Sequence, residues 1–124
     1  MKTILVVDDH ADIRRLIRLT LEFEDYDIHE AAHGEAALEM AQALRPDLVL
    51  LDVMMPGPLN GLDVCRRLRG AAAPGAAPRV IMLSARGQAS DREAGLAAGA
   101  DVYLVKPFSP LQLIDCIAGL WAAA

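Results

Sequence analysis

The chain contains few aromatic residues, only two cysteines and no long hydrophobic run. Phe, Trp and Tyr make up 4% of its 124 residues, so Ala, Leu and Val must build most of a hydrophobic core. Cys65 and Cys116 match no metal or redox spacing, and we interpret both as small core residues in a reducing cytosol. No apolar stretch could cross a bilayer, and the N-terminus lacks a signal-peptide pattern. We therefore expect a cytoplasmic protein without membrane contact.

The charge balance also excludes a class of function. The formal net charge is −5, and no basic stripe is available to contact phosphates of a nucleic acid. We therefore expect no direct nucleic acid binding by this domain. A chain of this length is large enough for one hydrophobic core, so residues 1–124 are expected to form one domain.

Short apolar segments alternate with amphipathic segments along the whole chain. The apolar segments predict strands at 3–7, 26–31, 48–52, 80–83 and 101–105. The amphipathic segments predict helices at 11–24, 35–44, 62–69, 88–98 and from Pro110 to the region of Trp121. Right-handed crossovers between such units build a parallel sheet with helices on both faces, so the fold class is α/β, doubly wound.

The ends and faces of these helices can be predicted as well. In the last helix Ser109 is the N-cap and Gln112 completes a capping box. Gly70 is expected to end the third helix, and Asp25 to take a left-handed conformation after the first. The residues expected to face the core from the first and last helices are Ile13, Leu16, Ile17, Thr20, Leu21, Leu111, Ile114, Ile117 and Trp121.

Polar residues follow four of the five predicted strands. Asp8 and Asp9 follow the first strand, Asp52 ends the third, Ser84 follows the fourth and Lys106 follows the fifth. The carboxyl ends of parallel strands lie at one edge of a sheet, where ligands bind in open α/β folds. The sequence therefore predicts that these five side chains converge.

Converging carboxylates repel one another unless a cation lies among them, and oxygen ligands suit Mg²⁺. Beside Mg²⁺ and the Lys106 ammonium group, Asp52 can remain ionised and attack phosphorus to give an aspartyl phosphate. Phosphoryl transfer requires chiefly positioning and charge neutralisation, to which Lys106 and the Ser84 hydroxyl can contribute.

Four motifs in this order resemble the receiver domain of two-component response regulators, including chemotaxis regulators. They are Val6–Asp9 (VVDD), Leu51–Gly57 (LDVMMPG), Leu83–Ala85 (LSA) and Gly99–Phe108 (GADVYLVKPF). The resemblance covers essentially the whole chain. It implies a flavodoxin-like (βα)5 fold with strand order 2-1-3-4-5 and a phosphorylation-controlled signalling switch.

The resemblance also implies a role for each site residue. Asp52 is the phosphoacceptor, and Mg²⁺ is bound by Asp9, Asp52 and the main-chain carbonyl of Met54. Asp8 contacts the metal through water or orients its ligands.

The remaining implied roles concern the response to phosphorylation. Lys106 pairs with the phosphoryl group, Ser84 moves in to bond it, and Tyr103 is an aromatic switch that turns inward. The surface that changes is formed by the fourth helix, fifth strand and fifth helix, where a homodimer can form.

The implied partners are a sensor histidine kinase or phosphotransfer protein and a downstream protein or a missing output domain. The chain is not an enzyme in this interpretation, although it promotes its own phosphorylation and dephosphorylation.

The sequence departs from the family pattern in the loop after the phosphoacceptor. One extra residue lies between Asp52 and Gly61, within Pro58-Leu59-Asn60, beside the predicted site. Family members often have a cis bond at the position of Lys106-Pro107, which this sequence alone does not determine.

Two other functions remain open from sequence. A pseudo-receiver would bind a partner without being phosphorylated, and the lengthened loop is compatible with that. An aspartyl-phosphate phosphatase of the haloacid dehalogenase kind normally has a second Asp two residues after the nucleophile, where this chain has Met54.

Simpler roles exist for several of these residues. Asp8-Asp9 could cap the first helix, and Tyr103 could be a half-buried strand residue. We interpret His10, His29 and His33 as surface residues. The arginines of the first helix, Arg14, Arg15 and Arg18, are interpreted as a solvated face, with kinase contact as the alternative.

Overall fold

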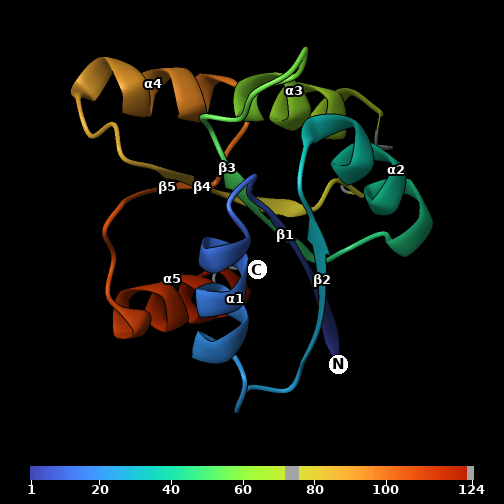
Figure 1. The fold of residues 1–124 in the computed structure, drawn as a ribbon, viewed down its shortest axis with the longest axis vertical. Coiled ribbons are helices and arrows are strands. Elements are labelled where there is room, and N and C mark those ends of the chain that lie inside the picture. Colours follow the sequence, from blue (N-terminus) through green and yellow to red (C-terminus); the bar gives the residue numbers. More distant parts are fainter. Residues whose placement is uncertain (72–75, 123–124) are drawn as a thin grey trace.

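The computed structural model describes residues 1–71 and 76–122, and in these ranges five strands alternate with five helices (Figure 1). The strands are β1 (Lys2–Val7), β2 (Tyr26–Ala31), β3 (Leu48–Asp52), β4 (Arg79–Ser84) and β5 (Val102–Val105). The helices are α1 (Ala11–Thr20), α2 (Gly34–Leu44), α3 (Gly61–Ala71), α4 (Ala89–Ala97) and α5 (Pro110–Ala122). None of the described helices is long and apolar enough to span a bilayer.

All strand pairs are parallel, and the sheet has the order β2-β1-β3-β4-β5 that the resemblance implied. The chain begins near the middle of the sheet, at β1, and winds outward in both directions. The ends of β1 and β3 therefore border the crevice where the winding changes direction. The more polar β2 lies at an edge, as predicted.

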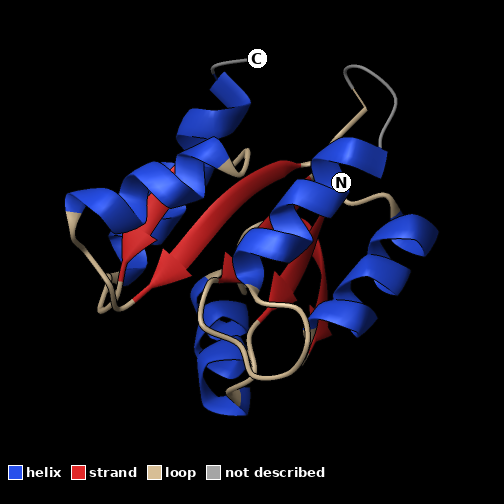
Figure 2. Ribbon diagram, turned by 90° about the horizontal axis from the view of Figure 1, so that it is seen from above, coloured by secondary structure: helices blue, strands red, loops and turns tan. Residues whose placement is uncertain are grey.

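The side chains of the sheet alternate between two hydrophobic cores, because successive residues of a strand point to opposite faces. One core contains Leu5, Val7, Val49 and Leu51, and it is covered by α2, α3 and α4. The other contains Ile4, Val6, Leu48 and Leu50, and it is covered by α1 and α5. Figure 2 shows the twisted sheet between these two helical layers. A sheet covered on both faces explains why the central strands read as unbroken apolar runs.

Several predicted helix boundaries were wrong. The first helix ends at Thr20 rather than at residue 24, and 21–24 form turns. The left-handed residue lies not at Asp25 but at Arg45, which has φ 47° after α2 and ahead of Pro46. The third helix continues through Gly70 to Ala71, because a glycine weakens a helix without necessarily ending it.

The helical faces were predicted only in part. Ile17 and Leu21 are buried as expected, but Leu16 is 49% exposed. In α5 the buried residues are Leu113, Ile117 and Leu120, whereas Leu111 is 65% exposed. The capping box is confirmed by reciprocal bonds between Ser109 and Gln112, at 2.8 and 3.1 Å. Since Ser109 and Pro110 begin the helix, Leu111 lies in its exposed first turn.

The start of α3 packs directly against the backbone at the end of β3. A Cβ at Gly61 would collide with the Asp52 carbonyl oxygen and lie 2.7 Å from Val53 Cα. At Gly70, in the same helix, a Cβ would meet no atom of the described residues within 4 Å. We predict that Gly61→Ala lowers the free energy of unfolding by about 2 kcal/mol or more, since backbone must move. Gly70→Ala should be neutral or stabilising by about 0.5–1 kcal/mol.

Urea denaturation of the two variants measures this difference, and the second variant is the control for a Gly→Ala change in α3. Equal stability of the two variants would show that the close approach at Gly61 does not constrain the end of β3.

Candidate functional site

Asp52 is a buried carboxylate at the end of the fully buried strand β3. Its side chain is 4% exposed. Oδ1 lies 3.4 Å from both the Lys106 Nζ and the Met54 main-chain nitrogen. Oδ2 is buried and accepts no hydrogen bond from the described residues. A carboxylate oxygen in that position is costly unless a ligand or cation completes its surroundings.

Lys106 joins two of the acidic residues. Its Nζ donates to Asp8 Oδ2 at 3.0 Å as well as to Asp52 Oδ1. Its main-chain nitrogen donates to the Ser84 carbonyl at 2.8 Å, and the Lys106-Pro107 bond is cis. The ends of β1, β3, β4 and β5 thus bring the predicted polar residues together, as expected from the parallel sheet.

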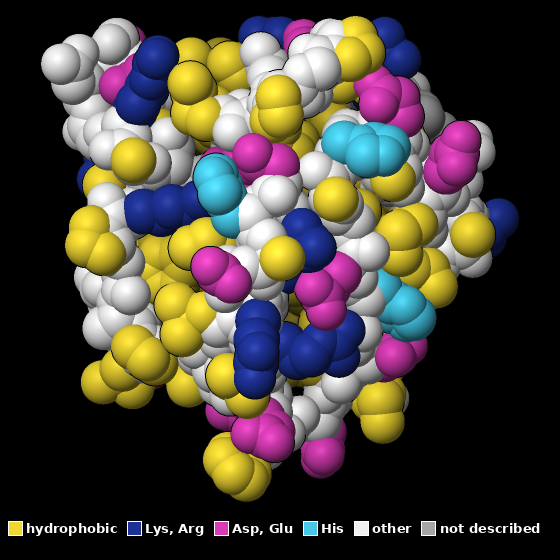
Figure 3. Space-filling view, in the orientation of Figure 1, with side chains coloured by type: hydrophobic (Ala, Val, Ile, Leu, Met, Phe, Trp, Pro, Cys, Tyr) yellow, Lys and Arg dark blue, Asp and Glu magenta, His cyan; other side chains and the backbone are white. Residues whose placement is uncertain are grey.

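Asp8, Asp9 and His10 follow β1 at the same edge. Asp8 is fully buried, and its Oδ1 accepts from the His10 main-chain nitrogen at 2.8 Å. The N-cap of α1 is His10, not either aspartate, so the interpretation of Asp8-Asp9 as a helix cap is wrong. His10 Nδ1 lies 3.1 Å from Asp8 Oδ1 and 3.2 Å from Asp9 Oδ1. In Figure 3 an exposed histidine lies against acidic side chains on the face that carries α1.

The electrostatics of the cluster follow from burial and like charge. Burial, followed by the nearby Asp8 charge, raises the pKa of Asp52 to about 6 against the opposing effect of Lys106. For Lys106, burial acts to lower the pKa, but the Asp8 hydrogen bond and the two carboxylate charges outweigh it and raise the pKa. The site therefore carries more negative charge than one ammonium group compensates.

The residues present fit a divalent cation. Ligand atoms of Asp8, Asp9, His10 and Asp52 all lie within 4.8 Å of one another. Two buried carboxylate oxygens, Asp9 Oδ1 and Asp52 Oδ2, accept no hydrogen bond from the described residues. Both oxygens of Asp8, in contrast, already accept hydrogen bonds. Asp9 and Asp52 are thus the available direct oxygen ligands, with Asp8 beside them.

Ser84 and Tyr103 are linked through one residue. Ser84 is fully buried, and its Oγ accepts from the Arg86 main-chain nitrogen at 3.1 Å. Tyr103 is buried, and its hydroxyl donates to the Arg86 carbonyl at 2.7 Å. The Tyr103 side chain is therefore buried in this structure, with its hydroxyl bonded to the Arg86 carbonyl, and is not half-buried as in the simpler role.

Sequence reasoning missed the contribution of Arg14. Its side chain is only 17% exposed, so the interpretation as a solvated face is wrong for this residue. Nη1 donates to the Asp8 carbonyl at 2.7 Å, and Nε pairs with Glu30 at 3.0 Å. Arg18 pairs with the same carboxylate at 2.9 Å. Arg14 thereby fixes the backbone at Asp8 to the neighbouring strand β2.

The comparisons with known proteins agree with this geometry. The family model described as "Response regulator receiver domain" matches residues 4–118. The chain belongs to this family.

Individual relatives support the assignment. The chain is 48% identical over 111 residues to the transcriptional regulatory protein ResD of Bacillus subtilis, covering 90% of this chain and 44% of ResD. It is equally similar to the response regulator MprA of Mycobacterium tuberculosis, covering 90% of this chain and 46% of that protein. The chain thus spans about half the length of these relatives. It is a receiver domain homologous to phosphorylation-regulated response regulators of two-component systems.

Solved structures show the same fold. A putative response regulator from Chloroflexus aurantiacus has a TM-score of 0.89 at 35% identity, with 98% of both chains covered. The chemotaxis protein CheY4 of Vibrio cholerae has a TM-score of 0.84 at 32% identity, with 95% of this chain and 97% of that chain covered.

The loop between Asp52 and Gly61, in which the sequence predicts one extra residue, is anchored at its C-terminal end. Leu59 packs against the start of α2, where a Cβ at Gly34 would lie 2.7 Å from Leu59 Cβ. Asn60 and Asp63 exchange hydrogen bonds at 3.0 and 3.2 Å, which caps the start of α3. Packing and capping thus hold this part of the loop, and the acidic cluster beside it is assembled.

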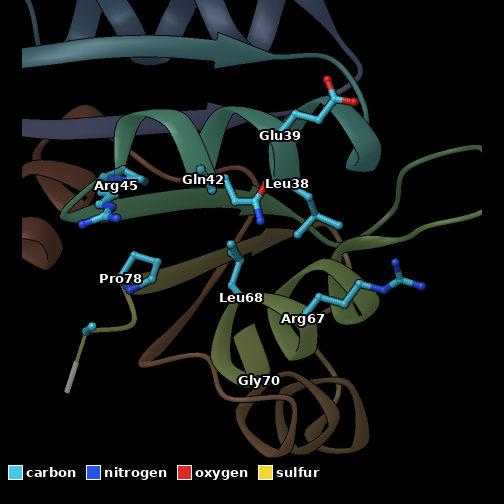
Figure 4. Close-up of a pocket in the computed structure, with 11 residues that line it drawn as sticks. Leu38, Glu39, Gln42, Arg45, Arg67, Leu68, Gly70 and Pro78 are labelled. Carbon is cyan, nitrogen blue, oxygen red and sulfur yellow. The ribbon is translucent and has the colours of Figure 1, made fainter. Parts of the chain in front are cut away.

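One cavity lined by described residues lies away from the acidic cluster. It has a volume of about 790 Å³ between α2 and α3, where Leu38 and Gln42 face Leu68 (Figure 4). A smaller cavity, about 350 Å³, adjoins the site and is lined by Met54, Arg86 and Tyr103 among others. The site of this receiver domain is therefore recognised by its charges and not by cavity size.

The raised pKa of Asp52 predicts a pH-dependent stability. Because the pKa in the fold, about 6, exceeds the ordinary 3.8, ionised Asp52 destabilises the metal-free fold. The penalty is absent below the ordinary value and complete above the raised one. We predict that Asp52→Asn raises the free energy of unfolding at pH 7.5, in EDTA, by about 1–3 kcal/mol. At pH 4 the two proteins should differ little.

Urea denaturation at both pH values, with and without Mg²⁺, measures this effect. Mg²⁺ should stabilise the wild type and not the variant. A variant less stable than the wild type at pH 7.5 would contradict the prediction.

Proposed function

We propose that Asp52 accepts a phosphoryl group from a phosphohistidine of a sensor histidine kinase or phosphotransfer protein. The observation that carries the proposal is the buried, unpartnered Oδ2 of Asp52 beside Lys106 and the aspartates. A carboxylate oxygen attacks phosphorus, the phosphorus–nitrogen bond breaks, and its electron pair remains on the leaving imidazole, which takes up a proton. Mg²⁺ held by Asp9, Asp52 and the Met54 carbonyl, with Asp8 acting through water, would neutralise charge on the phosphoryl oxygens.

Lys106 and Ser84 act on the phosphoryl group in this proposal. Lys106 lies close enough to Asp52 to pair with an added phosphoryl oxygen without leaving the cluster. The Ser84 hydroxyl is at the end of the strand that pairs with β3, so it can move in to bond the same group. These residues also promote the domain's own phosphorylation and dephosphorylation by positioning and neutralisation.

The switch would operate through Arg86, whose backbone bonds both Ser84 and Tyr103. If Ser84 Oγ turns toward a phosphoryl group, it releases the Arg86 nitrogen and shifts the carbonyl that holds Tyr103. The ring of Tyr103 lies under α4, so the change reaches the surface formed by α4, β5 and α5. We infer that this surface contacts a downstream protein, an output domain or a second copy of the chain.

The setting of this activity is also a proposal. The relatives are response regulators, about half of whose length this chain spans, so 1–124 is proposed to be a receiver unit acting on a separate or attached output. The described thiols, Cys65 and Cys116, are free, which suits the reducing cytoplasm.

We predict that incubation with acetyl phosphate and Mg²⁺ adds one phosphoryl group to the protein, because the carboxylate, ammonium group and cation then surround phosphorus. The measurement is intact mass spectrometry. Asp52→Asn and a chelator should each abolish the adduct, and Lys106→Met should reduce it strongly. The exposed acid Glu22 provides the control Glu22→Gln, which should be phosphorylated normally.

An adduct that persists in Asp52→Asn would place the phosphoacceptor elsewhere. If the folded wild type, with Mg²⁺ bound, forms neither an adduct nor a beryllofluoride complex by NMR, the domain is a pseudo-receiver. Continuous release of phosphate from acetyl phosphate, with rapid turnover, would instead support the phosphatase alternative.

The contact between α4 and Tyr103 allows the switch to be tested separately. A Cβ at Gly95 would lie 2.7 Å from the Tyr103 ring and 3.0 Å from Met82 Sδ. We predict that Gly95→Ala displaces the ring, costs about 1–3 kcal/mol of stability, and still permits phosphorylation of Asp52. Beryllofluoride-induced NMR shifts in α4 and β5 should be reduced, while those around Asp52 remain.

Gly119→Ala, in α5, is the matched control because a Cβ there would meet no atom of the described residues within 4 Å. Normal α4 shifts in a folded Gly95→Ala protein would show that the position of Tyr103 does not transmit the change.

A further inference from the structure

His10 brings a nitrogen to the edge of the acidic cluster. Its Nδ1 lies 3.1 Å from Asp8 Oδ1 and 3.2 Å from Asp9 Oδ1, and the side chain is 65% exposed. As the N-cap residue of α1 it makes no side-chain capping bond. Its imidazole therefore has no role in the helix and is directed toward the carboxylates.

The separations around Nδ1 are those of neighbouring metal ligands. Two adjacent ligands about 2.1 Å from an ion lie about 3.0 Å apart in octahedral coordination and about 3.4 Å apart in the tetrahedral coordination usual for Zn²⁺. The 3.2 Å from Nδ1 to Asp9 Oδ1 falls in that range, and one ligand atom each of Asp8, Asp9, His10 and Asp52 lies within 4.8 Å of the others. Of these, Asp8 Oδ1 already accepts hydrogen bonds. The backbone bond from His10 to Asp8 Oδ1, at 2.8 Å, keeps the residue next to the cluster.

A separate observation shows that the cluster is incomplete without a cation. The Asp52 side chain is only 4% exposed, and its Oδ2 accepts no hydrogen bond from the described residues. Asp9 Oδ1 lies within 3.2 Å of His10 Nδ1 but accepts no hydrogen bond from it or from the other described residues. Nδ1 thus lies within hydrogen-bond distance of Asp8 Oδ1 and beside an Asp9 oxygen that has no hydrogen-bond partner among the described residues, so an ion between Nδ1 and Asp9 Oδ1 would complete the surroundings of that oxygen.

We propose that His10 is a metal ligand through Nδ1 and gives this receiver domain a preference for borderline divalent ions such as Zn²⁺. The proposal rests on the proposed function, because Asp9 and Asp52 are the shared oxygen ligands. Imidazole is a strong ligand of Zn²⁺, whereas Mg²⁺ strongly prefers oxygen and keeps several of its waters. His10 should therefore change the affinity for Zn²⁺ and have little effect on that for Mg²⁺.

The competing role of His10 is electrostatic: a protonated imidazole that hydrogen-bonds Asp8 and offsets negative charge. Its Nδ1–Asp8 Oδ1 distance is compatible with that bond. In that case the imidazole competes with any cation, and its removal should strengthen binding of Mg²⁺ and Zn²⁺ alike. The two roles thus predict opposite effects of one substitution.

The other two histidines must be replaced before the measurement, because each has an acidic neighbour that could help it bind Zn²⁺. His29 pairs with Asp27 at 3.0 Å, and His33 lies 3.2 Å from Glu35. His33 also accepts from the Ala36 nitrogen as the α2 cap, so His33→Asn retains a capping residue. A His29→Gln, His33→Asn background leaves His10 as the single imidazole of the 124-residue chain.

Calorimetric titration of this background with Zn²⁺ alone and with Mg²⁺ alone, before and after His10→Ala, tests the proposal. We expect His10→Ala to weaken Zn²⁺ binding at least about tenfold and to change Mg²⁺ binding less than about threefold. In ¹⁵N NMR spectra the Nδ1 resonance of His10 should shift to a metal-bound position with Zn²⁺.

Unchanged Zn²⁺ affinity, equal losses for both ions or stronger binding of both after His10→Ala would each overturn the proposal, as would an unshifted Nδ1 resonance at saturating Zn²⁺. Asp52→Asn in the same background is the separate test of the shared site. If Asp52→Asn leaves Mg²⁺ binding unchanged, Asp52 is not a metal ligand. That result would contradict the metal site of the proposed function whatever the role of His10.

Discussion

The contact of the Lys106 ammonium group with two buried carboxylates is the interaction on which the site depends. Asp8 follows β1 and Asp52 ends the adjacent strand β3, so two buried carboxylates share one ammonium group. One ammonium group compensates only part of their charge, as the pKa of Asp52, raised to about 6, shows. The domain thus holds a carboxylate that is ionised near neutral pH but under-compensated, a condition that favours both cation binding and attack on phosphorus.

That condition is maintained by the fold rather than by local sequence. The five parallel strands place their polar ends at one edge, and the two hydrophobic cores hold the strands in register. The Asp8 backbone is fixed by Arg14, and the Asp52 backbone by the close approach of Gly61. Each carboxylate is therefore positioned by a residue of the helix that follows its own strand. At such a site, packed helices and strands hold the functional side chains in position.

The sequence pattern predicted the strands and the convergence of the five polar residues, because buried strands are short apolar runs and parallel strands end at one edge of a sheet. The strand order was implied by the resemblance to the receiver family. The sequence could not predict which oxygens of Asp8 are already hydrogen-bonded, since that depends on the path of the chain at His10. The predicted exposure of Arg14 and the predicted burial of Leu16 were also wrong. Both residues lie on one helix, and their burial depends on how far α1 is rotated against β2 and α5, which periodicity determines only to within part of a turn.

The coupling between Ser84 and Tyr103 needs no displacement of the ring from solvent into the core. The tyrosine is already inward, held by the Arg86 carbonyl, while the nitrogen of the same residue holds Ser84. If Ser84 turns toward Asp52, its hydrogen bond from the Arg86 nitrogen is lost. The Arg86 carbonyl, which accepts from Tyr103, would then shift as well, because it belongs to the same residue. In the proposed switch, a small motion at the site would thereby change the position of the Arg86 backbone and of the Tyr103 ring that it holds. The glycine at the contact, Gly95, leaves the ring room to lie beneath that helix. In the proposed switch the element with two states is thus the backbone at Arg86, and Tyr103 would transmit its position to the surface.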